Sequence, residues 1–60
     1  MSAELHNEAT ECRRIAAEYK QKAEATESPA GKDLYKLFGD SYTELAEAYE
    51  AMTAKELLVE

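Results

Sequence analysis

The feature that most limits how this chain can fold is that turn-forming residues gather in only one place. Thr26, Ser28, Pro29 and Gly31 lie together, and no other cluster of this kind occurs in the 60 residues. Gly and Pro weaken helices, while Ser and Thr favour turns and caps. The flanking segments are rich in Ala, Glu, Leu and Lys, which are strong helix formers. The sequence therefore predicts an all-α fold of two helices joined by one turn.

Capping residues set the expected helix ends. Ser28 followed by Pro29 fits an N-cap with proline at the first helical position, where its missing N–H is not needed. Ser2 is expected to cap the first helix in the same way, with Glu4 near the positive end of the helix dipole. We predict helices at about 3–26 and 29–57, which form a single helical hairpin over residues 1–60.

Each segment carries an apolar stripe with heptad spacing, which is typical of helices that pack side by side. The first stripe is made mostly of small residues, namely Leu5, Ala9, Cys12, Ala16, Tyr19, Ala23 and Thr26. The second is made of large residues, namely Tyr35, Phe38, Tyr42, Leu45, Tyr49 and Met52. Small side chains opposite large ones pack densely. We therefore predict an antiparallel hairpin in which these two stripes face each other.

Two registers keep antiparallel heptads in phase. One places Tyr19 opposite Tyr35, and the other places Tyr19 opposite Tyr42. The first is favoured because the Ser28-Pro29 helix start implies a short connection. It leaves the end of the second helix overhanging.

The second helix has more apolar surface than a narrow first helix covers. A chain this short rarely gains more than roughly 3–5 kcal/mol from one core, and a single Cys forms no internal disulfide. We therefore predict a homodimer that closes as a four-helix bundle. Its expected interface consists of Ile15, Leu34, Leu37, Phe38, Ser41, Leu45 and Ala48. For the tail at 57–59, packing across the dimer, fraying and a separate hydrophobic contact all remain open.

Acidic residues outnumber basic ones, with 13 Asp and Glu against 7 Lys and Arg and a net charge of −6. The hairpin brings the first helix's Glu4 and Glu8 beside the second helix's acids, so its open end is expected to be acidic. This charge disfavours nucleic-acid binding, which depends on Lys and Arg contacts. The predicted surface for a protein partner consists of Glu44, Glu47 and Glu50.

No segment approaches the roughly 20 apolar residues of a membrane span, and the first residues lack the pattern of a signal peptide. We therefore expect no membrane association and a cytoplasmic location.

Residues suited to catalysis or metal binding are few. His6 is the only His, and Ala3 occupies the position where a bundle metal site would need Glu. Cys12 has no second Cys or nearby imidazole to activate it, so we expect a small core residue. The sequence predicts no catalytic residue, no metal and no cofactor, and hence a protein that is not an enzyme.

Two functions fit these features. The first is a small interaction protein, acting as an adaptor, inhibitor or assembly factor through a dimeric acidic bundle. The alternative is a bundle that binds a small ligand or a cation through Tyr35, Tyr42 and Tyr49 and nearby carboxylates.

Three segments resemble a group of short, uncharacterised bacterial proteins. They are Cys12-Arg13-Arg14-Ile15-Ala16, the Ser28-Pro29 turn, and Leu45-Ala46-Glu47-Ala48-Tyr49-Glu50. The group shares a C-R-x-[LI]-A helix, a D-P-like turn and an L-A-x-x-Y-E helix, although Ser replaces the turn Asp here. The resemblance implies a small bacterial helical hairpin and adds no mechanism.

Overall fold

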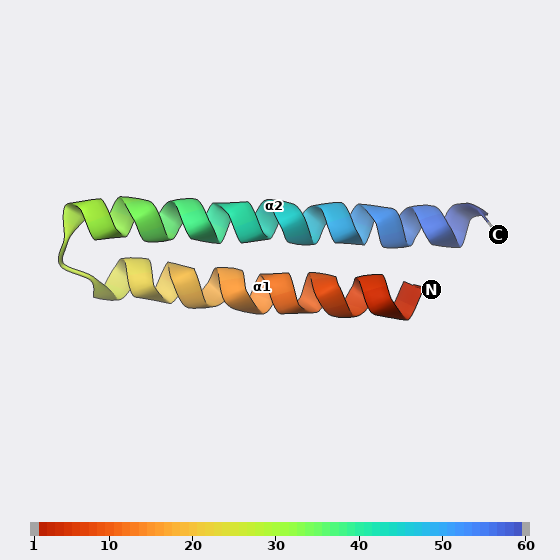
Figure 1. The fold of residues 1–60 in the computed structure, drawn as a ribbon, viewed down its shortest axis with the longest axis horizontal. Helices are drawn as coiled ribbons and strands as arrows, with labels where there is room; N and C mark the ends of the chain where they lie inside the picture. The colour runs from red at the N-terminus through yellow and green to blue at the C-terminus, as the bar shows by residue number, and fades with distance from the viewer. Residues whose placement is uncertain (1, 60) are drawn as a thin grey trace.

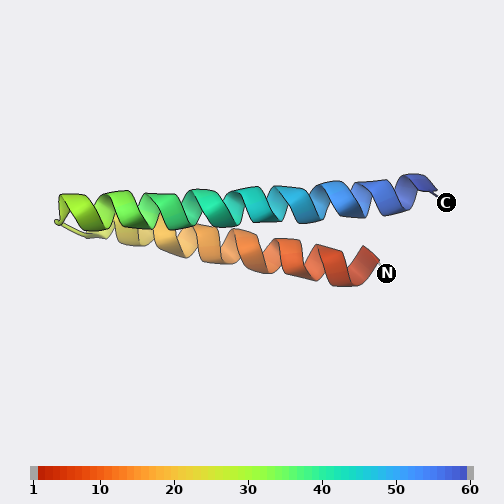
Figure 2. The same cartoon turned by 45° about the horizontal axis from the view of Figure 1, so that its top comes forward.

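The computed structural model describes residues 2–59 and shows two long antiparallel helices. Helix α1 spans Ser2–Ala25 and helix α2 spans Pro29–Val59. Figures 1 and 2 show them side by side, with both chain ends at the end opposite the turn and α2 extending beyond the start of α1. The two-helix hairpin predicted from the sequence is confirmed. Side chains are described for residues 3–56, so the predicted Ser2 cap and the packing of the tail at 57–59 lie outside the described residues.

The connection between the helices is held by short-range hydrogen bonds. The Ser28 hydroxyl accepts a hydrogen bond from the Gly31 N–H at 3.1 Å, which confirms Ser28 as the N-cap of α2. The Thr26 hydroxyl accepts one from the Ser28 N–H at 3.2 Å. The Thr26 N–H also donates to the Lys22 carbonyl at 3.0 Å and completes the last turn of α1. Local side chains thus fix both helix ends at the turn.

The stripe predicted on α1 is the one that faces α2. Its small members are almost fully buried, with exposed fractions of 3–6% for Ala9, Cys12, Ala16 and Ala23. Its larger members are half-buried, namely Leu5, Tyr19 and Thr26. The heptad spacing of α1 therefore predicted its packing face correctly.

The stripe predicted on α2 is wrong in half of its positions. The residues that face α1 are Tyr35, Gly39, Tyr42, Ala46, Tyr49 and Thr53. Leu45 and Met52 instead stay exposed, and Phe38 is 37% exposed although its ring contacts Tyr19 of α1. Compared with the prediction, α2 is rotated about its own axis. On the side that faces α1, small residues, and not large ones, therefore alternate with the tyrosines.

Close approach of the two backbones explains this rotation. A Cβ atom placed on Gly39 would lie 3.5 Å from the Ala16 carbonyl oxygen and 3.3 Å from Lys20 Cγ. Ala46, which also faces α1, has no exposed surface. Large side chains at these positions would hold the helices apart, so small residues on both helices allow closer packing.

Neither predicted register is correct. The Tyr19 ring lies between Tyr35 and Tyr42, with centroid distances of 6.1 and 6.0 Å, and 5.1 Å from the Phe38 ring. Tyr19 is therefore level with Phe38 and Gly39, midway between the two alternatives. Because α2 is rotated, the residues that pack between the tyrosines are 39, 46 and 53 instead of 38, 45 and 52. This shift by one residue allows the intermediate register. Four residues earlier on α1, Ile15 is level with about residues 42–43 of α2.

Candidate functional site

Large apolar side chains form a continuous exposed surface along α2, which we call the apolar face. Leu34, Leu37, Phe38, Leu45 and Met52 are between 37% and 59% exposed. Ser41 and Ala48 lie between them and are also exposed. By contrast, no large side chain of the described residues is fully buried. The largest hydrophobic groups of the hairpin thus lie on its surface.

The apolar face continues onto one edge of α1. Phe38 contacts Tyr19, and the Lys22 ammonium lies 5.4 Å from the centre of the Tyr19 ring. Ile15 lies one helical turn before Tyr19 and is half-buried. The seven residues predicted for a dimer interface are therefore all at least partly accessible, and they gather on one side of the hairpin.

The opposite edge of the hairpin carries an ion pair between the two helices. The Arg13 guanidinium donates two hydrogen bonds of 2.7 Å to the two carboxylate oxygens of Glu50. Hydrogen bonding to Arg13 lowers the pKa of Glu50, and the same bonds raise the pKa of Arg13. The positive charge of Arg13 and the nearby His6 add smaller effects in the same direction on Glu50. The predicted acidic surface is therefore partly neutralised.

A second set of charges pairs within α1. Arg14 donates to Glu11, with one of its bonds at 3.2 Å, and also to Glu18. Hydrogen bonding to Arg14 lowers the pKa of Glu11. Arg14 and Glu18 have the i,i+4 spacing at which opposite charges commonly pair on a helix surface.

Glu44 and Glu47, the other two residues of the predicted partner surface, remain exposed. Within residues 3–56, neither carboxylate makes a hydrogen bond or ion pair. The negative charge of Glu47 nevertheless makes a small contribution to the raised pKa of Arg13. These two carboxylates are thus accessible to another molecule.

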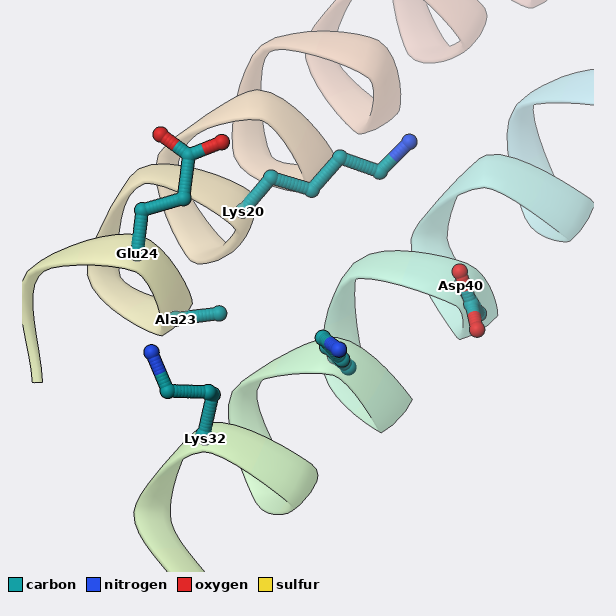
Figure 3. Close-up of a pocket in the computed structure, with 6 residues that line it drawn as sticks. Lys20, Ala23, Glu24, Lys32 and Asp40 are labelled. Carbon is teal, nitrogen blue, oxygen red and sulfur yellow. The ribbon is translucent and has the colours of Figure 1, made fainter. Parts of the chain in front are cut away.

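An open groove lies near the turn, on the side that carries Lys20 and Lys32. Its lining residues are Lys20, Ala23, Glu24, Lys32, Lys36 and Asp40. In Figure 3, Lys32 points toward Ala23 on α1, while the Glu24 carboxylate points away from α2. The charged part of this lining consists of three lysines and two acidic residues.

The other side chains that could carry chemistry are His6, Cys12 and the tyrosines. His6 is exposed and Cys12 is buried in the seam between the helices. Tyr35 and Tyr42 are half-buried against the Tyr19 ring, and none of the tyrosines lines the groove near the turn. Over the described residues, no three His, Cys, Asp or Glu side chains are grouped in a way that suits a metal ion.

Sequence reasoning missed Gly39, Ala46 and the Arg13–Glu50 pair. A signal for the first two was present, because Gly39, Ala46 and Thr53 repeat every seven residues beside the tyrosines. The Arg13–Glu50 pair had no local signal, since it depends on the register of two helices.

Within the described residues, neither helix has an apolar stretch long enough to span a bilayer. The chain matches no protein-family model, no curated protein and no solved structure.

Proposed function

We propose that this chain is a non-enzymatic interaction protein that works as a homodimer and presents acidic side chains to a protein partner. The observation that carries the proposal is the apolar face. The residues that the hairpin buries are all small, namely Ala9, Cys12, Ala16, Ala23, Gly39 and Ala46, while Leu34, Leu37, Phe38, Leu45 and Met52 remain exposed. A second copy that covers this face would supply the large hydrophobic core that one hairpin lacks.

The surface area of the hairpin supports a second copy. The hairpin exposes 4613 Å², whereas a compact monomer of its 6.7 kDa mass exposes about 3900 Å². The excess is about 700 Å², close to the roughly 800 Å² that each partner buries in a standard protein interface. Two hairpins joined through their apolar faces would form a four-helix bundle with α2 of each copy near the centre.

Glu44 and Glu47 support the second part of the proposal. Neither carboxylate takes part in the Arg13–Glu50 ion pair, and both residues are exposed. Acidic groups at an interface mainly speed the approach of a positively charged partner. We therefore propose a partner with a basic surface, bound by the dimer as an adaptor, inhibitor or assembly factor.

Sedimentation of the unmutated chain tests the dimer. The expected result is a species of twice the 6.7 kDa chain mass at micromolar concentration, with a helical spectrum. A stable, folded monomer under these conditions would overturn the proposal.

A charge-neutralising variant tests the partner surface. With a partner identified by co-purification, the double variant Glu44→Gln/Glu47→Gln should associate more slowly and with less dependence on salt, while it remains a folded dimer. The matched control is Glu24→Gln/Glu27→Gln, which removes the same charge near the turn. Equal association rates for the two double variants would show that the acidic residues of α2 are not the binding surface.

A further inference from the structure

We infer that the second copy packs antiparallel to the first, with Glu8 of each hairpin paired with Lys22 of the other. This inference rests on the proposed dimer and adds the orientation of its two copies. It follows from three residues on one edge of α1, from the register of the hairpin and from the distribution of charge along it.

Glu8, Ile15 and Lys22 lie on one edge of α1, because residues seven apart occupy the same side of a helix. That edge borders the apolar face, since Lys22 lies over the Tyr19 ring and Tyr19 contacts Phe38. The other edge of α1 carries Arg13, which pairs with Glu50. A second copy that covers the apolar face therefore also approaches Glu8, Ile15 and Lys22.

The middle of this edge coincides with the middle of the apolar face. Tyr19 is level with Phe38 and Gly39, so Ile15 is level with about residues 42–43 of α2. The apolar face runs from Leu34 to Met52, and its midpoint is residue 43. Ile15 therefore marks the centre, with an acidic residue seven positions before it and a basic residue seven positions after it.

Only one two-fold arrangement of the copies brings Glu8 of one chain to Lys22 of the other. With the axis perpendicular to the helices and through the level of Ile15, Glu8 is level with the partner's Lys22, and Leu34 with the partner's Met52. With the axis parallel to the helices, α1 of one copy instead lies against α2 of the other, so Glu8 is not brought to the partner's Lys22. Only the first arrangement pairs these opposite charges, and it is the one we propose.

The charge of the whole hairpin favours the same arrangement. Residues 3–15 and 43–56, at the open end, carry seven acidic and three basic side chains. Residues 16–42, at the turn end, carry five acidic and four basic ones. An antiparallel dimer places the acidic end of one copy beside the nearly neutral end of the other. A parallel dimer would place both acidic ends together.

Distances between spin labels distinguish the two arrangements. We would replace Cys12 with Ala and attach one nitroxide per chain through Glu8→Cys, Ile15→Cys or Lys22→Cys, each checked for a dimeric mass. In an antiparallel dimer, labels at position 8 are offset along the helix by about 21 Å, because each lies seven residues from the axis. The same offset applies at position 22. The 8–8 and 22–22 distances should therefore both exceed the 15–15 distance, and three similar distances would overturn the proposed orientation.

A charge reversal tests the ion pair in the otherwise unmutated chain. Glu8→Lys should weaken the dimer about ten-fold, because both Glu8–Lys22 pairs become repulsive. The double variant Glu8→Lys/Lys22→Glu should recover most of the original affinity. An unchanged affinity for Glu8→Lys would overturn the pairing. A monomeric unmutated chain would instead overturn the proposed dimer itself, so the two failures are distinguishable.

Discussion

The seam between α1 and α2 and the apolar face of α2 differ in the size of their side chains. The seam buries Ala9, Cys12, Ala16 and Ala23 against a side of α2 that contains Gly39 and Ala46. The apolar face exposes large residues, among them Leu37 and Met52. Small residues allow two backbones to approach closely, but each removes little apolar area from water. The comparison teaches that the seam sets how the two helices lie against each other. Most of the apolar area that could still be removed from water lies on the apolar face of α2.

A charge placed on the apolar face gives the largest expected effect. Leu45→Glu should weaken the proposed dimer by about 2 kcal/mol, roughly 30-fold in Kd, because a carboxylate would have to leave water at the proposed interface. Sedimentation across a concentration series measures this change, and helicity should fall as monomer forms. Ala54→Glu is the matched control, because Ala54 is exposed and lies nine residues further along α2, on the side opposite Leu45. Similar Kd values for both variants would show that the apolar face is not the interface.

A large side chain in the seam should have an effect of similar size, on folding instead of on association. Ala16 is 4% exposed, and its carbonyl oxygen is close to Gly39. Ala16→Leu should lower the free energy of unfolding by about 1–3 kcal/mol because it overpacks this contact. Ala17→Leu, whose site is exposed, should have almost no effect. Urea unfolding at a fixed protein concentration measures both, and equal destabilisation by the two variants would contradict the seam described above.

Neutralising Glu50 should give the smallest effect. Arg13 lowers the pKa of Glu50 in the folded protein, so the ionised carboxylate favours folding. This contribution is present above the unfolded-state pKa of the carboxyl group and is lost as the pH falls through the lower folded-state pKa. Glu50→Gln should therefore melt slightly below the unmutated protein near about pH 7, and the difference should vanish in strong acid.

The matched control for Glu50→Gln is Glu44→Gln. Glu44 makes no ion pair within residues 3–56, and the acidic Glu47 lies one helical turn from it on α2. Its neutralisation should leave the melting temperature at neutral pH unchanged or raise it slightly at low salt. Thermal melting followed at several pH values checks both variants. A pH-independent difference for Glu50→Gln would contradict a contribution from its ionised form.

Features that depend on neighbouring residues were predictable from the sequence. The Ser28 cap, the start of α2 at Pro29 and the buried side of α1 follow from local hydrogen bonding and from the spacing of apolar residues. Of the exposed residues of the apolar face, Leu34 and Leu37 were expected on the part of α2 that a narrow α1 does not cover, whereas Phe38, Leu45 and Met52 had been placed in the stripe that faces α1. The use of Gly39 in the seam was not predicted, because a glycine contributes no apolar side chain to a heptad pattern.

The sequence by itself determined that two helices form, where the chain turns between them, and which side of α1 is buried. It did not determine which of two adjacent stripes of α2 faces α1, since Tyr35, Tyr42 and Tyr49 belong to both, and the stripe predicted from the large residues was wrong. Only the tertiary structure decided this, and with it the register and the Arg13–Glu50 pair. The physical reason is that the choice depends on how closely the backbones approach at Ala16 and Gly39, a property of the helix pair and of neither helix alone.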